Sequence, residues 1–218
     1  MIFRDRYDAG QKLAGRLQHF TGDSNVILLA LPRGGIPVAY EVARALHVPM
    51  DVFIVRKLGV PGHEELAMGA IASGGVRVLN RQVVEQLGIP QSIIESVARR
   101  QEEELHRREQ LYRGDLPFPD LHGKAVILID DGLATGATMR AAAKAARLEG
   151  AHRIVVAVPV ASKETCQEIE AEVDEAICAV TPLGFFAVGQ WYEDFRPTSD
   201  EDVRELLMKA MKDLRRVA

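Results

Sequence analysis

Short runs of apolar residues, each followed by a helical pattern, recur along this 218-residue chain. Short β-branched runs that alternate with amphipathic segments are typical of βαβ units. Strands that are apolar on both faces belong in a sheet that helices cover on both sides. We therefore expect an α/β fold of the Rossmann-like, doubly wound type, with a mainly parallel sheet flanked by helices. The predicted strands are 25–31, 50–55, 125–129, 153–158 and 175–180, and the predicted helices between and around them are 8–20, 37–46, 137–149 and 163–172.

One region interrupts this rhythm, and the length of the chain still fits a single domain over residues 1–218. We place the core of the domain at about 20–57 and 120–180. Residues 66–73 and 76–79 predict short strands, and residues 80–112 predict a helical insert of two helices joined near 88–90. The second of these helices alternates acidic and basic residues, which favours a solvated helix along one edge and leaves contact with a partner chain open.

Composition excludes several classes of protein. Hydrophobic residues make up 47% of the chain and the net charge is −4, which argues against disorder and against nucleic-acid binding through bulk positive charge. The six histidines have no zinc-ligand spacing, and the two cysteines, Cys166 and Cys178, form no CxxC pair, so we expect reduced thiols. The first residues are charged and the longest apolar run, 154–161, is too short for a bilayer. We expect no signal peptide, no membrane contact and a cytoplasmic protein.

The strongest chemical signal is the segment 126–138, VILIDDGLATGAT. An apolar strand ends in two carboxylates, Asp130 and Asp131, and a glycine-containing loop leads at once into a helix. A helix N-terminus suits a phosphate, and the carboxylates can accept hydrogen bonds from vicinal hydroxyls or hold Mg²⁺ through water. The segment predicts a ligand with a phosphate and a diol, as in a ribose 5-phosphate. Its predicted substrate-binding residues are Gly132, Leu133, Ala134, Thr135, Gly136, Ala137 and Thr138.

Two familiar phosphate loops do not fit this segment. A Walker A loop needs a lysine at the helix start, and a dinucleotide-binding GxGxxG is absent as well. The structural alternative is an acidic turn that only caps a helix, with Thr135 as the N-cap residue.

The segment resembles the phosphoribosyl-pyrophosphate (PRPP) loop of the type I phosphoribosyltransferases, which combines apolar residues, two acids and Thr-Gly positions. The resemblance implies that the loop holds the 5-phosphate of PRPP. It also implies that Asp130 and Asp131 fix the ribose hydroxyls and contact Mg²⁺ indirectly, through water or substrate.

Two shorter segments fit the same family. Arg33, Gly34 and Gly35 follow the first predicted strand, where the family keeps its pyrophosphate loop, and glycines there let backbone amides approach an anion. Arg56 and Lys57 follow the second predicted strand and are similar to a pair that contacts pyrophosphate in orotate-type enzymes. The alternatives are a plain strand-to-helix turn and a surface pair.

The resemblance also implies a mobile loop and a hood that cover the site. Residues 58–75 are similar to the mobile loop that closes over the site, with His63 in a catalytic or substrate role, although the same residues suit an exposed loop. Residues 181–200 are similar to the hood of purine-type enzymes, in which Phe185 or Phe186 would stack on a base and Glu193 or Asp194 would meet a metal or an exocyclic group. Of these we take Phe186 and Glu193 as site residues. A hydrophobic clasp that ties the C-terminal helix to the sheet is the equal alternative for this segment.

The implied reaction displaces pyrophosphate from C1 of PRPP by a nitrogen nucleophile. Asp130, Asp131, Arg33 and Lys57 would be the catalytic residues, and Mg²⁺ would be held mostly by substrate oxygens. The implied partners are PRPP and a base, with nucleic acid disfavoured and a homodimer left open. The alternative from another class is a PRPP- or nucleotide-sensing regulatory protein that keeps the fold without turnover, and a phosphatase or hydrolase is a third.

Overall fold

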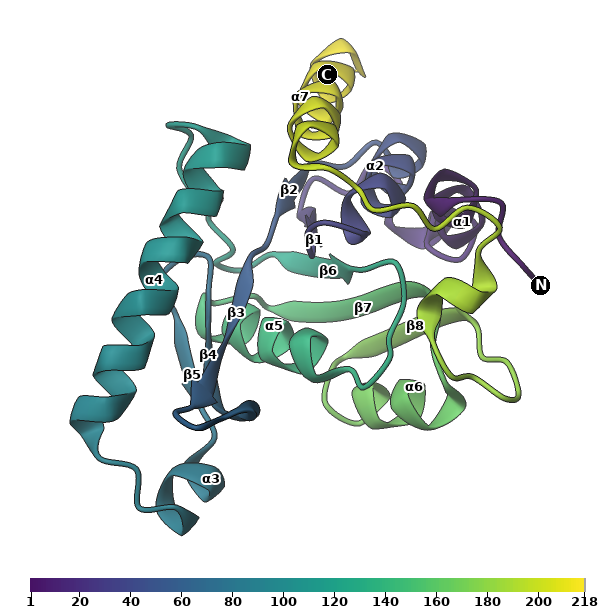
Figure 1. Ribbon diagram of the computed structural model, residues 1–218. Coiled ribbons are helices and arrows are strands. Elements are labelled where there is room, and N and C mark those ends of the chain that lie inside the picture. Colours follow the sequence, from purple (N-terminus) through teal and green to yellow (C-terminus); the bar gives the residue numbers. More distant parts are fainter. Residues whose placement is uncertain (218) are drawn as a thin grey trace.

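The computed structural model describes residues 1–217. A five-stranded sheet forms its centre, with the strand order β2-β1-β6-β7-β8 and every neighbouring pair parallel (Figure 1). The predicted α/β fold with a mainly parallel sheet flanked by helices is confirmed. The strands are β1 (Val26–Ala30), β2 (Met50–Val52), β6 (Ala125–Ile129), β7 (Arg153–Val160) and β8 (Glu175–Val180).

Helices cover both faces of this sheet, because alternate residues of each central strand face opposite cores. Leu28 and Ala30 of β1 join a core with α1, α2 and α7, whereas Ile27 and Leu29 join a core with α5 and α6. Figure 1 shows the first group of helices above the sheet and the second group below it. The helices are α1 (Arg6–Ala14), α2 (Gly35–Leu46), α5 (Ala137–Leu148), α6 (Lys163–Glu170) and α7 (Asp200–Val217).

A second, antiparallel sheet stands beside the first, at the left of Figure 1, with the strand order β3-β4-β5. Its strands are β3 (Val55–Val60), β4 (His63–Ala72) and β5 (Arg77–Leu79). The two predicted insert helices follow it as α3 (Arg81–Gln86) and α4 (Gln91–Arg113), and α4 packs along the small sheet. The insert helix therefore has one face on this sheet, with Ile94, Ala98 and Leu105 buried.

The predicted strand 50–55 needs correction, whereas the predicted strands 66–73 and 76–79 are observed as β4 and β5. The chain leaves the parallel sheet after Val52, and Val55 already pairs with Ala72 in the small sheet. Residues 58–75 are mostly the β3–β4 hairpin, with Gly62 at φ 81° in its turn. A local apolar pattern cannot distinguish one strand from two that belong to different sheets, because the difference lies in the partner strand.

The predicted helix 8–20 also divides. Asp5 accepts a hydrogen bond from the backbone N–H of Asp8 and caps α1. The helix therefore begins at Arg6, two residues before the predicted start. α1 ends at Ala14, and the 3₁₀ turn η1 (Gln18–Phe20) follows. Leu13, Leu17 and Phe20 are all buried, as their spacing predicts.

The two cysteines form a disulfide in this structure, so the expected pair of reduced thiols is wrong here. Cys166 lies in α6 and Cys178 in β8, with the Cα atoms 6.4 Å apart. That separation lies within the range of about 4.4–6.8 Å that a disulfide spans. The packing of α6 on β8 brings them together, and sequence spacing alone could not show this.

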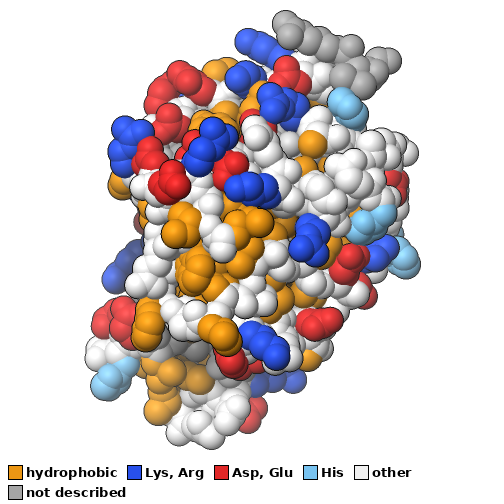
Figure 2. Space-filling view, turned by 90° about the vertical axis from the view of Figure 1, so that its right-hand side faces the viewer, with side chains coloured by type: hydrophobic (Ala, Val, Ile, Leu, Met, Phe, Trp, Pro, Cys, Tyr) orange, Lys and Arg blue, Asp and Glu red, His pale blue; other side chains and the backbone are white. Residues whose placement is uncertain are grey.

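Strand β8 forms one edge of the main sheet, and its residues are half-buried along its whole length. Figure 2 views the molecule from the right-hand side of Figure 1, the side on which β8 and α6 lie. Hydrophobic side chains gather in the middle of that face, between groups of charged side chains. Within residues 1–217, no helix is long and apolar enough to cross a membrane.

Candidate active site

The two adjacent carboxyl groups lie at the carboxyl end of β6, in the middle of the sheet. The backbone N–H of Asp131 donates to Oδ1 of Asp130 over 2.8 Å. Oδ2 of Asp131 accepts a hydrogen bond of 2.8 Å from Nε of Arg6, and only 11% of the Arg6 side chain and 15% of the Asp131 side chain are exposed. Sequence reasoning gave no role to Arg6, because nothing in its local pattern points to residue 131.

Burial controls the charge of this pair. It raises the pKa of Asp130 well above its ordinary value, and the neighbouring charge of Asp131 raises it further. Burial also raises the pKa of Asp131, while the guanidinium of Arg6 opposes that rise. The two carboxyls therefore titrate as a pair, and Arg6 favours the ionised form of Asp131.

The first residues of the loop that follows pack in the core, whereas later side chains of the loop are exposed. Gly132 is buried, and a Cβ there would lie 2.6 Å from Cγ1 of Val188. Leu133 is 3% exposed and packs in the core below the sheet, so its backbone alone remains for a ligand. The carbonyl oxygen of Ala134 accepts a hydrogen bond of 3.0 Å from the hydroxyl of Thr165. These contacts fix the first half of the loop to the protein.

The second half of the loop opens α5 and is exposed. Gly136, at φ 70°, is the N-cap residue in place of Thr135, although the Thr135 hydroxyl still accepts a hydrogen bond of 3.5 Å from the backbone N–H of Ala137. Thr135, Ala137 and Thr138 all have exposed side chains. Their hydroxyls and the N–H groups of the first helical turn form the kind of site that binds a phosphate.

The predicted pyrophosphate loop packs directly against the two carboxyls. A Cβ at Gly34 would lie 2.0 Å from Oδ2 of Asp131, and one at Gly35 would lie 2.7 Å from the carbonyl oxygen of Ile129. Both glycines are therefore required for this close approach. The peptide bond between Pro32 and Arg33 is cis. The exposed Arg33 side chain points toward α7, with Nη1 3.7 Å from Oδ1 of Asp200.

A cavity of 710 Å³ lies between the β3–β4 hairpin, α4 and the start of α5. This size falls within the range of about 300–1,000 Å³ usual for small-molecule sites. The cavity brings Arg56 and Lys57 together with Thr135, Ala137 and Thr138, as the resemblance implies, whereas Arg33 and the two carboxyls do not line it. Its lining residues are Val55, Arg56, Lys57, Gly59, Pro61, Glu64, Ile93, Ser96, Val97, Arg100, Gln101, Thr135, Ala137 and Thr138.

Helix α4 supplies a wall of this cavity that sequence reasoning missed. Oε1 of Gln101 accepts hydrogen bonds from Nε and Nη2 of Arg56, over 3.0 and 2.7 Å, and so holds the guanidinium. Arg100 lines the same wall. Lys57 is 3.2 Å from the carboxylate of Glu65 in this structure. The helical insert is thus a part of the candidate site.

Three predicted site residues lie elsewhere among the described residues. His63 is exposed at the start of β4, and Phe186 is 84% exposed, so neither lines the 710 Å³ cavity. Glu193 is exposed, and its backbone N–H donates to the carbonyl oxygen of Phe3. None of these three side chains lines the cavity that contains Thr135, Ala137 and Thr138.

The predicted hood, residues 181–200, contains a clasp that joins the N-terminal residues to the carboxyl turn. Phe3 forms a parallel bridge with Tyr192, and their rings pack 5.5 Å apart. The hydroxyl of Tyr192 donates to the carbonyl oxygen of Asp131 over 2.6 Å. This clasp differs from the one expected as the alternative, because it ties residues 3 and 192 to the carboxyl turn and does not tie the C-terminal helix to the sheet.

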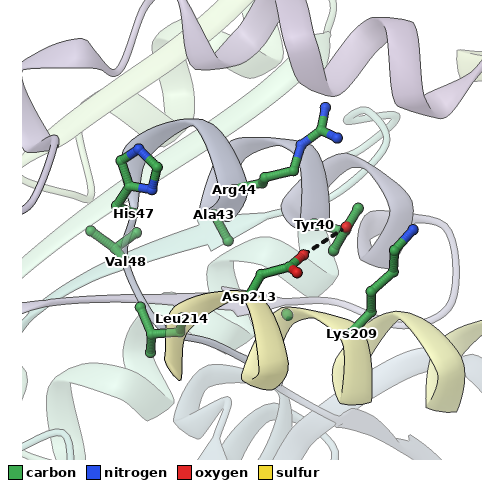
Figure 3. A pocket seen from close by; sticks show the side chains of 9 residues that line it. Tyr40, Ala43, Arg44, His47, Val48, Lys209, Asp213 and Leu214 are labelled. Carbon is green, nitrogen blue, oxygen red and sulfur yellow. Dashed lines mark hydrogen bonds between the residues drawn. The ribbon is translucent and has the colours of Figure 1, made fainter. Parts of the chain in front are cut away.

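A second cavity, of 400 Å³, lies between α2 and α7 (Figure 3). Figure 3 shows the hydroxyl of Tyr40 directed at Asp213, to which it donates over 2.9 Å. Burial and this carboxylate raise the pKa of Tyr40 to about 12. None of the predicted site residues lines this cavity, so it is separate from the candidate active site.

Fold and site together define an α/β protein in which two carboxylates end a central strand. A glycine-containing loop follows them and leads into a helix. Ligands of open α/β sheets bind at this end of the strands. A model of the phosphoribosyl transferase domain matches residues 62–189. The chain belongs to the phosphoribosyl transferase family.

Individual relatives agree with this assignment. Two Mycobacterium tuberculosis proteins, from strains CDC 1551 and H37Rv and each named "putative phosphoribosyl transferase", are 46% identical over 212 residues, or 97% of this chain. The chain spans 48% of the length of these relatives. The crystal structure of the protein TT1426 from Thermus thermophilus is 44% identical, with a TM-score of 0.86 over 96% of this chain and 99% of that one.

Proposed function

We propose that the protein transfers the ribose 5-phosphate group of PRPP to a nitrogenous base or a related acceptor and releases pyrophosphate. The observation that carries the proposal is the 710 Å³ cavity, in which the exposed loop of Thr135, Ala137 and Thr138 faces Arg56 and Lys57. A phosphate-binding helix start and two cations in one cavity suit a substrate with phosphates at both ends.

The residues divide the work by chemistry. The α5 start would hold the 5-phosphate, and the carboxyl turn of Asp130 and Asp131 would accept hydrogen bonds from the ribose hydroxyls. The acceptor nitrogen forms a bond to C1 of the ribose as the bond from C1 to the pyrophosphate oxygen breaks. Pyrophosphate leaves with the bonding electron pair, and the acceptor nitrogen loses its proton. Lys57 and Arg33 would stabilise the charge that develops on the leaving group.

Mg²⁺ fits this arrangement as a cation held mainly by the substrate. The described residues contain no group of three or more His, Cys, Asp or Glu side chains that could hold a metal ion. Two adjacent carboxyls can contact a substrate-bound ion through water, which is the usual manner of Mg²⁺. The ion would supply charge neutralisation at the pyrophosphate oxygens.

Thermal melting with PRPP plus Mg²⁺, beside ribose 5-phosphate and pyrophosphate alone, tests the site. A ligand at 100 times its dissociation constant stabilises by roughly 2.7 kcal/mol, which raises the Tm of a domain of this size by roughly 5–11 °C. We expect a shift with PRPP that the Asp130→Asn/Asp131→Asn double variant loses while it keeps its fold. An unchanged shift in the double variant would contradict the assignment of the ribose hydroxyls to these carboxyls.

Release of pyrophosphate in the presence of purine, pyrimidine and related acceptors then tests turnover. PRPP binding without release by any acceptor would favour the regulatory alternative, a PRPP sensor without turnover. The homodimer and the cytoplasmic location stay predictions.

A further inference from the structure

Arg6 is a largely buried arginine at the start of α1, with 11% of its side chain exposed, and the proposed reaction gives it no role so far. Its Nε donates to Oδ2 of Asp131, and its Nη1 donates to the carbonyl oxygen of Arg196 over 2.8 Å. Its guanidinium lies over the ring of Phe195, with Cζ 3.9 Å from the ring centroid. Three separate contacts therefore fix the orientation of this side chain.

The carboxylate of Asp131 is held between Arg6 and the backbone of the pyrophosphate loop. Gly34 approaches so closely that even a methyl group would meet Oδ2. The carbonyl oxygen of Asp131 accepts a hydrogen bond from the hydroxyl of Tyr192. The backbones of Trp191 and Glu193, on either side of Tyr192, are hydrogen-bonded to Phe3. The position of this carboxylate therefore depends on Phe3, Arg6 and residues 191–196, which lie far from it in the sequence.

A structural role alone is a weak explanation for such a pair. A buried ion pair stabilises a fold little, because removing two charges from water offsets their attraction. Its specific effect is geometric, since the guanidinium donates one hydrogen bond to Asp131 and another to the carbonyl oxygen of Arg196, which fixes the carboxylate relative to residues 191–196 and favours its charged form. The proposed function needs a charged carboxylate in a fixed position, and it assigns this role to Asp131.

We propose that Arg6 is a positioning residue of the phosphoribosyl transfer site, which holds the carboxylate of Asp131 ready for a ribose hydroxyl. This inference rests on the proposed function. The groups that face Asp131 are Arg6 from α1, Asp130 from the same turn, Tyr192 from the clasp and the neutral backbone of Gly34.

Isothermal titration of PRPP with Mg²⁺ into wild type, Arg6→Gln and Arg6→Lys tests the proposal, with circular dichroism melts to show that each variant is folded. Arg4→Gln is the matched control, because the Arg4 side chain is 71% exposed and lies 3.7 Å from Asp8. Loss of a partner that orients a site residue usually costs about 10- to 100-fold in affinity or activity. We expect such a loss for Arg6→Gln, a smaller one for Arg6→Lys and none for Arg4→Gln.

One further readout separates positioning from general stability. In an Asp131→Asn background, Arg6→Gln should weaken PRPP binding no further, because Arg6 acts through that carboxylate.

The outcomes distinguish the inference from the proposed function. If wild type binds no PRPP, the proposed function fails and the inference fails with it. If wild type binds PRPP and Arg6→Gln binds it equally well or more tightly, only the inference fails, and tighter binding would show that Arg6 blocks the carboxylate. If Arg6→Gln does not fold, the PRPP affinity of Arg6→Lys is compared with that of Arg4→Gln instead. An unchanged affinity in Arg6→Lys then overturns the inference.

Discussion

Gly34→Ala should destabilise the protein through a single steric contact. The backbone of Gly34 has φ −60° and ψ −33°, a conformation that alanine adopts without strain. The added Cβ would lie 2.0 Å from Oδ2 and 2.6 Å from Cγ of Asp131, whereas real Cβ contacts essentially never fall below 3.0 Å. The whole expected loss therefore comes from the collision with Asp131.

The size of the effect follows from how firmly Asp131 is held. Its Oδ2 cannot step aside without lengthening the 2.8 Å hydrogen bond from Arg6. Overpacking of this kind costs about 1–3 kcal/mol, and the reduced entropy of the unfolded chain returns about 0.4–1 kcal/mol. The midpoints of these ranges leave a net loss of about 1.3 kcal/mol, which lowers the Tm by roughly 3–5 °C in a domain of this size.

Gly15→Ala is a matched control, because Gly15 has φ −60° and ψ −24° and a Cβ there would lie 3.4 Å from the nearest atom, the carbonyl oxygen of Lys12. Circular dichroism melts should show this variant unchanged or stabilised by about 0.4–1 kcal/mol. Adding Asp131→Ala to Gly34→Ala removes the colliding atoms, so the two losses should not add. If Gly34→Ala melts like Gly15→Ala, the backbone of Gly34 does not pack closely against the Asp131 carboxylate.

Two further predictions concern protonation and the cysteines. Asp130→Asn should stabilise the protein at neutral pH while it weakens PRPP binding. The pKa of Asp130 is raised in the folded protein, so above the ordinary pKa of about 3.9 the carboxyl ionises more readily in the unfolded chain, which favours unfolding. The stability difference between the variant and wild type should grow as pH rises from about 4, and a difference that stays flat in melts across this range would contradict it. Titration of unreduced, denatured protein should find no free thiol at Cys166 or Cys178, whereas two free thiols would restore the expectation from the sequence.

The sequence predicted the local parts of the fold and site well, because their determinants are close together along the chain. The apolar strand 125–129 ends at Asp130 and continues through a glycine loop into a helix, as observed. Five consecutive buried residues already indicate a central strand of a parallel sheet. The insert also follows its sequence signals, with two helices separated by residues 87–90.

Tertiary structure decided everything that depends on which segments meet. Residues 50–60 could not be divided between two sheets from their own pattern, since each part is defined by its partner strand. The cysteine pair, the α4 wall and the clasp around Tyr192 arise from packing between distant elements. From the sequence alone, residues 181–200 allowed a hood or a clasp, and only the tertiary structure shows that Tyr192 reaches the carboxyl turn.

The contrast is sharpest at the two carboxyls. Asp130 and Asp131 are evident from the sequence, because two acids at the end of an apolar strand have no packing purpose. Arg6 and Gly34 act on Asp131 from positions 125 and 97 residues away, and no local periodicity connects them. Identity and order of residues determined what chemistry is present, while folding determined the charge, the burial and the orientation of that chemistry, because these depend on distances in space.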